Sequence, residues 1–148
     1  EILPDRAAEV AIEERRPYRV HARLADRWRR GRLLIAGDAA HLNSPKGGMG
    51  LNGGVHDAFE LADHLAAVYA GAPLDSLDRY ERRRRPVVAE EIIAQADANR
   101  SRMAVTDPEA RRAELARLQA VAADPERARP FLARSSMLTG LARAREAA

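Results

Sequence analysis

A glycine-rich stretch over residues 37–58 holds the residue types and spacing that best suggest chemistry. It begins where an apolar run, residues 33–36, ends, and it passes through a loop with five glycines in the eight positions 47–54 before a helical pattern starts. The first turn of a helix presents unpaired N–H groups and a partial positive charge, which suit a ligand that carries negative charge. Glycines let the backbone approach such a ligand closely and adopt positive φ.

The same stretch contains the pattern G-x-G-x-x-G, from Gly48 to Gly53. We do not interpret it as the dinucleotide-binding fingerprint. That fingerprint follows a strand directly and is followed, about 20 positions later, by an acidic residue in a βαβ unit. Here the predicted strand ends near Ala36, well before the first glycine of the pattern, and residues 71–74 show no second strand.

A longer pattern is more specific: G-D-A-A-H at residues 37–41, P-x-G-G-x-G-x-N-x-G at 45–54 and D-A at 57–58. It resembles the second flavin-binding motif of the FAD-dependent aromatic hydroxylases, the single-component flavoprotein monooxygenases with the p-hydroxybenzoate hydroxylase fold. Distinctive features of the resemblance cover residues 17–90. The flanking matches are Y-R-V-H at 18–21, G-R-L-L at 31–34 and Y-E-R-R-R-R-P at 80–86.

The resemblance implies roles for individual residues. Asp38 matches an aspartate whose carboxylate accepts hydrogen bonds from the ribityl hydroxyls of the flavin, and Pro45 matches a proline that lines the flavin ring and the substrate cavity. The end of the glycine loop matches backbone N–H groups that face the pyrimidine edge of the ring, where negative charge collects on reduction. The cofactor-binding residues implied are Asp38, Pro45, Gly48, Gly50, Leu51 and Asn52, the last three through their N–H groups.

The family uses NAD(P)H to reduce its FAD and O₂ to transfer one oxygen atom to a phenol-like ring. FAD, NAD(P)H, O₂ and a small aromatic substrate are therefore the cofactors and partners that the resemblance implies. The cofactor carries the oxidation chemistry, so no side chain is assigned as catalytic. Two alternatives stay open: a related FAD enzyme of the halogenase or isoprenoid reductase type, and a non-catalytic helical interaction module that retains the glycine loop.

Members of this family begin with a βαβ unit whose glycine-rich turn binds the ADP half of FAD, and residues 1–4 show neither a methionine nor such a turn. We therefore expect a helix-rich α/β C-terminal fragment of a p-hydroxybenzoate hydroxylase-like FAD-binding fold, with few strands and without the N-terminal βαβ unit. The fragment is expected to be inactive without the remaining N-terminal part of the enzyme. We expect the end of the substrate-domain sheet at 1–30, the second FAD-contacting segment at 31–70 and a helical region at 71–148.

Composition restricts the class of protein. With 148 residues, 46% of them hydrophobic, the chain fits one domain with a packed core. It has no cysteine, which excludes disulfides and thiolate metal sites. Its 25 basic and 22 acidic residues are interleaved, which argues against nucleic-acid binding. No apolar run is long enough for a transmembrane helix and no targeting signal is visible, so we expect a cytoplasmic protein without membrane contact.

Periodicity places the first elements. Alternation of apolar and charged residues predicts a half-buried strand over 18–24, and residues 32–36 predict a short buried strand. Residues 52–69 predict a helix that Gly71 and Pro73 end. The face expected to be buried comprises Val55, Phe59, Ala62, Ala66 and Tyr69, and the opposite face comprises His56, Glu60, Asp63 and His64.

Two more helices are expected over 74–85 and 87–103, with a break or kink at Pro86 because proline lacks an N–H group. Their inward residues are expected to be Leu77, Tyr80, Val88, Ile92, Ala96 and Asn99.

Asp107 and Asp124 each precede a proline and are predicted helix N-caps. The first of these helices carries an apolar stripe, and the last helix is expected to run past Pro130 to Leu141. Residues 107–148 are expected to pack on the flavin domain or on a partner subunit, which would give a homodimer. The stripe comprises Leu115, Leu118, Val121 and Ala122.

Several of these residues have a purely structural interpretation beside the functional one. Asp38 could cap the loop that follows it, and Lys46 could lie near an anionic ligand or in solvent. His41 is expected to orient the loop by hydrogen bonding, and the spacing of His56 and His64 does not indicate a metal site.

Two further features also have a structural interpretation. Arginines 82–85 are expected to form a solvated helix end, where cations favour the helix dipole, rather than a phosphate clamp. Trp28 is expected to be a packing residue rather than a stacking platform.

Overall fold

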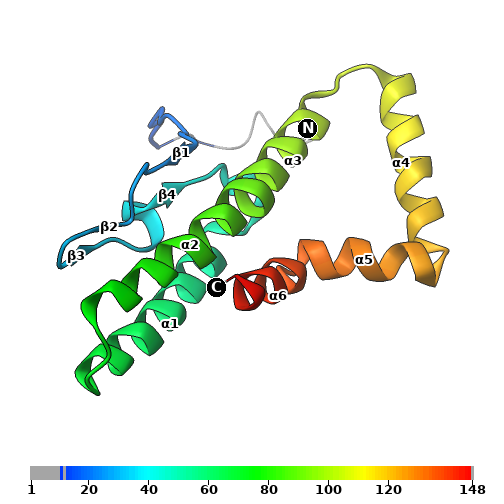
Figure 1. The fold of residues 1–148 in the computed structure, drawn as a ribbon. Coiled ribbons are helices and arrows are strands. Elements are labelled where there is room, and N and C mark those ends of the chain that lie inside the picture. Colours follow the sequence, from blue (N-terminus) through cyan, green and yellow to red (C-terminus); the bar gives the residue numbers. More distant parts are fainter. Residues whose placement is uncertain (1–10, 12, 148) are drawn as a thin grey trace.

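The computed structural model describes residue 11 and residues 13–147, and most of its regular structure is helical (Figure 1). Short strands in two antiparallel pairs lie on one side of the helices, which confirms the helix-rich α/β fold with few strands. The pairs are β1 (Arg23–Leu24) with β4 (His41–Leu42), and β2 (Arg29–Arg30) with β3 (Leu33–Leu34).

The predicted strands are too long. Of the strand expected over 18–24, only the last two residues pair, and Tyr18 is 82% exposed. No described strand lies beside residues 18–22 to take up their backbone hydrogen bonds, so the alternating pattern has no sheet to join. The buried strand over 32–36 is likewise wrong, because only β3 forms there and Leu33 is exposed.

Helix α1 (Gly50–Tyr69) confirms the predicted helix, but its buried side is not the predicted one. Phe59 and Tyr69 are 71% and 92% exposed, whereas Gly53 and Asp57 are buried. The remaining members of the predicted buried face, Val55, Ala62 and Ala66, are exposed as well. The periodicity identified the helix and its apolar stripe, but the neighbouring elements contact a different stripe.

Helix α2 (Asp78–Val87) follows the short helix η4 (Leu74–Leu77) and continues through a π-helical segment, η5 (Val88–Ile93), into α3 (Ala94–Ala104). A break at Pro86 is therefore wrong. The wider π pattern begins two residues after Pro86, so helical backbone continues past the missing N–H group. The inward residues are confirmed: Leu77, Tyr80, Val88, Ile92 and Ala96 are buried and Asn99 is half-buried.

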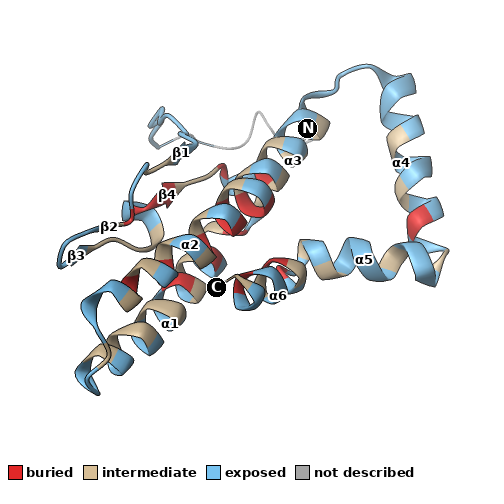
Figure 2. Ribbon diagram, viewed as in Figure 1, coloured by how far each residue is buried: buried red, intermediate tan, exposed pale blue. Residues whose placement is uncertain are grey.

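The core lies where the small strands meet α1, α2 and η5 (Figure 2). The buried Trp28 ring stacks on His41, with ring centroids 5.6 Å apart, and Tyr80 lies tilted against Trp28 at 5.6 Å. The Glu81 carboxylate accepts the N–H groups of Trp28 and Arg29 at 2.8 and 3.1 Å, which ties β2 to α2. Trp28 is thus a packing residue, as predicted.

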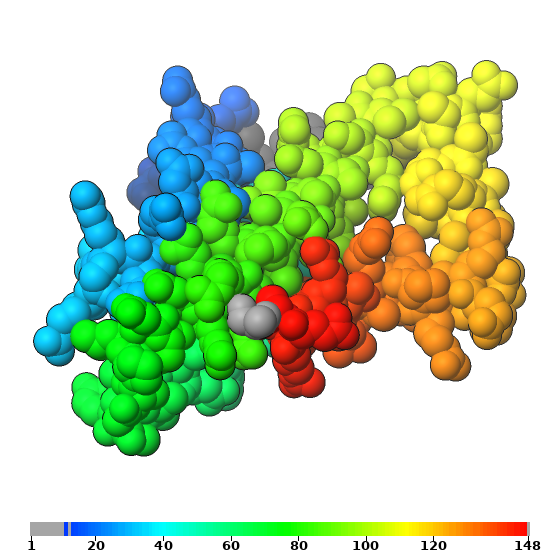
Figure 3. Space-filling model, in the orientation of Figure 1, coloured from blue at the N-terminus to red at the C-terminus, as the bar shows by residue number. Residues whose placement is uncertain are grey.

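The C-terminal region forms an arm that leaves the core and returns to it (Figure 1). Its helices are α4 (Pro108–Ala122), α5 (Pro125–Ser135) and α6 (Leu138–Glu146). Both predicted N-caps are confirmed: the Asp107 side chain accepts the N–H of Ala110 at 2.8 Å, and Asp124 accepts that of Glu126 at 3.0 Å. A hollow of about 550 Å³ lies between α3 and α5. Figure 3 shows an opening next to it, between the arm and α3.

The predicted apolar stripe of α4 is mostly not buried, because α4 packs only lightly on the rest of the chain. Val121 is buried, whereas Leu115 is exposed. The last helix passes Pro130, as predicted, but it does not reach Leu141 unbroken, because α5 ends at Ser135 and α6 begins after Met137, whose φ is +64°.

Helix α6 packs back on the α2–η5 region. Arg143 pairs with Glu90 and Glu91 at 2.6 and 3.1 Å, and a Cβ atom added at Gly140 would lie 2.7 Å from Val87. The last helix therefore packs on the same chain, which is the first of the two predicted arrangements. Across the described part of the chain, every helix is too short or too polar to span a bilayer.

Candidate functional site

The glycine loop and the start of α1 border a hollow of about 370 Å³. Asp38, Pro45, Gly48, Gly50 and Leu51 line it. A second hollow of about 530 Å³ continues along the first turns of α1, and Asp38, Gly50 and Leu51 line this one too. The fold therefore brings these predicted site residues together around a continuous open surface.

The first N–H groups of α1 have no protein acceptor among the described residues. Gly53 is the first residue of α1 whose N–H is bound, to the Met49 carbonyl at 2.8 Å. Met49, the N-cap residue, offers no side-chain hydrogen bond. The N–H groups of Gly50, Leu51 and Asn52 therefore remain available at the positive end of the helix dipole.

The side chain of Asn52, unlike its N–H group, is engaged within the protein. Its amide donates to the Gly48 carbonyl at 3.4 Å. Asn52 also lines a different hollow, of about 250 Å³, together with His56 and Met137. Gly48 lines both hollows, so the Asn52 side chain contacts a predicted site residue but does not line the hollow beside Asp38.

Asp38 lies in the short helix η2 (Gly37–Ala39) and its side chain is exposed. The N-cap of η2 is Ala36, and no side chain caps this helix. Within the described part of the chain, the Asp38 carboxylate has no hydrogen bond or ion pair, so the interpretation of Asp38 as a loop cap is wrong. An unengaged carboxylate can accept hydrogen bonds from a ligand with hydroxyl groups.

Two glycines allow close contacts around the hollows. A Cβ atom at Gly50 would lie 2.9 Å from the Asn43 Oδ1 atom. A Cβ at Gly54 would lie 3.3 Å from the Gly37 Cα atom, so the backbone of α1 passes directly against the backbone of η2. The absence of side chains at these positions lets the residues around the hollows lie close to α1.

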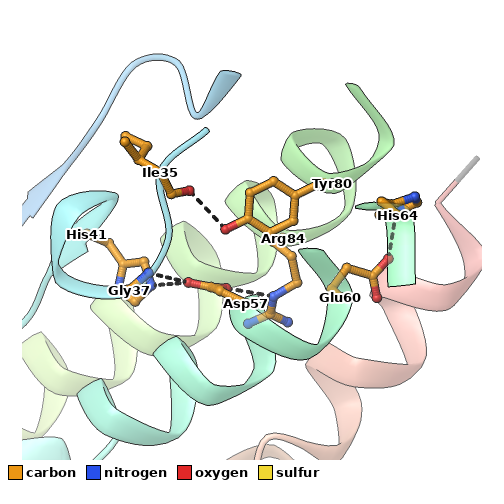
Figure 4. Close-up of polar contacts among 8 residues, drawn as sticks. All are labelled: Ile35, Gly37, His41, Asp57, Glu60, His64, Tyr80 and Arg84. Atoms are coloured by element: carbon orange, nitrogen blue, oxygen red, sulfur yellow. Dashed lines mark hydrogen bonds and ion pairs between the residues drawn. The ribbon is translucent and has the colours of Figure 1, made fainter. Parts of the chain in front are cut away.

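Behind the hollows lies a buried network centred on Asp57 (Figure 4). The Asp57 Oδ2 atom is 2.7 Å from the His41 Nε2 atom and accepts the Gly37 N–H at 3.2 Å. The Oδ1 atom accepts the Arg84 Nε–H at 2.8 Å. This confirms that His41 orients the loop by hydrogen bonding, and it shows that both oxygens of Asp57 are engaged.

Charge is concentrated in this network. Burial alone would raise the pKa of Asp57, but hydrogen bonds from His41 and Arg84 and the nearby positive charge of Arg84 offset it and lower the pKa below its ordinary value. Asp57 is therefore ionised at neutral pH and pairs with Arg84. The Nη1 and Nη2 atoms of Arg84 are buried without a partner among the described residues. The Asp57 carboxylate is therefore the group that offsets the cost of burying the Arg84 charge.

The prediction of a solvated helix end at 82–85 is wrong. Arg84 is 1% exposed, and Arg83 donates to Glu60 at 2.9 Å. Arg85 donates to the Ala25 carbonyl at 3.0 Å. These arginines hold α2 against α1 and β1, which the local sequence could not indicate because their acceptors lie far away along the chain.

His64 is 3.1 Å from the Glu60 carboxylate (Figure 4). The same carboxylate also binds Arg83. This pair is part of an ion-pair cluster between α1 and α2. Among the described residues, no three histidine, aspartate or glutamate side chains gather as metal ligands would.

Tyr80 fixes the chain just before the loop. Its hydroxyl donates to the Ile35 carbonyl at 3.0 Å (Figure 4), and burial raises the pKa of Tyr80 above its ordinary value, so the hydroxyl stays protonated. Helix α2 therefore holds the segment before Asp38 through Tyr80 and the network behind it through Arg84.

Comparison with known proteins agrees with this geometry. The model of a family described as an FAD binding domain matches residues 1–96. The chain belongs to this FAD-binding domain family. It is 48% identical over 101 residues to para-nitrophenol 4-monooxygenase from Pseudomonas sp. (strain WBC-3), an alignment that covers 68% of this chain and 25% of that protein. Its relatives are named monooxygenases, so it resembles the FAD-dependent aromatic hydroxylases as predicted.

Solved structures of related monooxygenases and hydroxylases share the fold. The p-nitrophenol 4-monooxygenase PnpA from Pseudomonas putida DLL-E4 has a TM-score of 0.75 and 41% identity, over 85% of this chain and 31% of that chain. Aklavinone-11 hydroxylase, solved as a ternary complex with FAD and aklavinone, has a TM-score of 0.51 and 49% identity, over 55% of this chain and 15% of that chain. The chain thus spans about a quarter of the length of para-nitrophenol 4-monooxygenase, of which the match covers 25%.

The exposed groups of this chain fit the cofactor for which its family is named. An unengaged carboxylate at Asp38 suits the ribityl hydroxyls, and unengaged N–H groups at the start of α1 suit an electron-rich ring edge. Asp57 and Arg84 are the residues that sequence reasoning did not assign. Both lie in stretches that carry the resemblance, Asp57 in D-A at 57–58 and Arg84 in Y-E-R-R-R-R-P at 80–86. Gly53 was a further signal, because a glycine inside a helix indicates close packing on its side, and Asp57 follows one turn later.

Proposed function

We propose that this chain is the flavin-contacting part of an NAD(P)H-dependent FAD monooxygenase that hydroxylates a phenol-like aromatic substrate with O₂. The observation that carries the proposal is the position of the unengaged Asp38 carboxylate and the unengaged N–H groups of α1 around the same hollow. Asp38, Pro45, Gly48 and the backbone of residues 50–52 would hold FAD. The bound cofactor would supply the oxidation chemistry, while the protein orients it and excludes water.

The names of the relatives support the substrate class. Para-nitrophenol 4-monooxygenase and aklavinone-11 hydroxylase are named for the oxidation of aromatic compounds, and the second was solved with FAD. The use of NAD(P)H and a cytoplasmic location are parts of the proposal that rest on the motif resemblance.

The remaining N-terminal part of the enzyme is the proposed partner of the exposed side of α1. Leu51, Phe59 and Tyr69 on this side are 81%, 71% and 92% exposed. Exposed apolar side chains in one stripe indicate a surface that another part of the protein covers. The rest of the enzyme would cover this stripe and complete the FAD site.

The test uses the complete enzyme that contains this chain. The purified protein is titrated with FAD, and NAD(P)H oxidation is then followed with and without added phenols. We expect FAD uptake and faster NAD(P)H oxidation when a phenol is present. FAD uptake without a response to any phenol would favour a related flavoenzyme, and a folded protein that takes up no FAD would favour the interaction module.

Asp38→Ala tests the site itself. Loss of hydrogen bonds to a charged acceptor is expected to weaken FAD binding about tenfold or more. Asp63→Ala is the matched control, because Asp63 is also exposed and lines neither of the two hollows. Equal FAD affinities for the two variants would contradict the assignment of Asp38.

A further inference from the structure

The segment that carries Asp38 is tied at both ends to one carboxylate. Asp57 accepts the N–H of Gly37, directly before Asp38, and pairs with the side chain of His41, three residues after it. Asp57 is 0% exposed, so it cannot touch a ligand in the hollow. Its contacts reach the site only through the backbone and side chain of this segment.

Few other polar contacts hold this segment. The Ala40 N–H binds the Gly37 carbonyl at 2.8 Å within η2, and His41 continues into β4, where it pairs with β1. Asp38 itself has no partner in the described part of the chain and is exposed. The anchors on each side therefore set the position of the Asp38 backbone, from which the carboxylate extends.

Packing leaves little room for the segment to move toward α1. A Cβ at Gly54 would lie 3.3 Å from the Gly37 Cα atom, closer than an ordinary contact, and His41 is stacked on Trp28. The hydrogen bonds to Asp57 act in the other direction, because they prevent the segment from moving away from α1. Contact on one side and hydrogen bonds on the other define one position for Asp38.

Stability alone does not explain a charged group here. A buried ion pair costs desolvation energy, and well-packed apolar residues often replace such pairs without loss of stability. Asp57 and Arg84 are both almost completely buried. A geometric role accounts for a carboxylate at this position, because only an acceptor with two oxygens can bind Gly37, His41 and Arg84 together.

We propose that Asp57 is a positioning residue of the flavin site, which holds the segment from Gly37 to His41 so that the Asp38 carboxylate faces the hollow, with Arg84 compensating its buried charge. This inference rests on the proposed function, since it concerns binding of FAD through Asp38. Asp57 would contribute to FAD affinity without contacting the cofactor.

Asp57→Asn in the complete enzyme is the first test. An amide has one oxygen, so its NH₂ group would face the Gly37 N–H or the Arg84 Nε–H, and one of these donors would lose its acceptor. We expect FAD binding, measured by fluorescence titration, to weaken about tenfold. Asp63→Asn, on the exposed part of α1, is the matched control and should leave FAD affinity unchanged.

A double-mutant cycle separates positioning from a general structural effect. If Asp57 acts through Asp38, Asp57→Asn should have little further effect on FAD affinity once Asp38 is alanine. Losses of FAD affinity that multiply in the double variant would overturn the proposal, because they would show that the two residues act independently.

His41 gives a second, milder test that does not depend on the folding of Asp57→Asn. His41→Gln keeps an N–H donor for Asp57 and should retain FAD affinity, whereas His41→Leu should weaken it. Equal losses in both variants would overturn the proposal. A wild-type enzyme that binds no FAD would instead contradict the proposed function, so the two failures are distinguishable.

Discussion

The two sides of α1 have opposite character. The side that faces β4 and α2 is buried and carries Gly53 and the ionised Asp57, whereas the other side carries Leu51 and Phe59 and is exposed (Figure 2). A helix that packed alone on a core would show the reverse arrangement. The difference shows that the apolar stripe of a helix does not by itself indicate which neighbouring segment, if any, contacts it.

Close approach and specific pairing explain the buried side. Gly53 lets α1 come near η5 and β4, and at this distance a carboxylate one turn later reaches Gly37, His41 and Arg84. The apolar residues on the exposed side are explained by the proposed partner, the rest of the enzyme. Four predictions test this difference between the two sides of α1.

Arg84→Met should have the largest effect. It leaves the Asp57 carboxylate buried without its charged partner, which is expected to cost about 3–5 kcal/mol of the free energy of unfolding. Urea unfolding of residues 1–148 measures this loss, with the exposed Arg79→Met on the same helix as control. Equal free energies of unfolding for the two variants would show that the Asp57–Arg84 ion pair does not stabilise the buried side of α1.

Gly53→Ala should be the next largest. The new Cβ would lie 2.7 Å from the Cδ1 atom of Ile92 and 3.3 Å from the Cε1 atom of His41. Overpacking of this kind costs about 1–3 kcal/mol. Ile92→Val removes the nearest atom, so the cost of Gly53→Ala should fall in that background; strictly additive losses in urea unfolding would argue against close packing on this side.

Low pH should lower the free energy of unfolding without any substitution, because Asp57 becomes protonated. The loss should be only partial, since the protonated Asp57 carboxyl still fills the same space. The pKa of Asp57 is lower in the folded chain than its ordinary value of 3.8, mainly through the bonds from His41 and Arg84 that offset burial. Its contribution to stability is therefore fully present above pH 3.8 and is lost as the pH falls through the folded value. Asp57→Asn should lose less stability than the wild type over that range, and identical pH profiles would contradict the shift.

Phe59→Ser, on the exposed side, should have the smallest effect on residues 1–148. Surface substitutions usually change the free energy of unfolding by within about 0.5 kcal/mol. The same change in the complete enzyme should destabilise it clearly more, because the side chain is then proposed to be buried. A loss of the same size in thermal unfolding of both proteins would show that nothing covers this side of α1.

Much of this protein follows from local sequence. The helix predicted over 52–69 and the caps at Asp107 and Asp124 depend on neighbours a few residues away, and all are confirmed. The inward positions of Tyr80 and Ile92 are also confirmed, because there the apolar pattern faces the core of this chain. The glycine loop and Asp38 could also be identified, because their motif lies within one short stretch. Their roles toward FAD stay predictions.

The tertiary structure decided what depends on distant partners. Residues 18–22 do not form a strand because none of the described strands lies beside them, and Arg84 is buried because Asp57, 27 positions earlier, lies opposite it. Short-range propensity determines which segments become helical and where they begin. Which side of a helix is covered, and which charges meet, is determined by contacts between segments far apart in the chain, whose geometry no local pattern encodes.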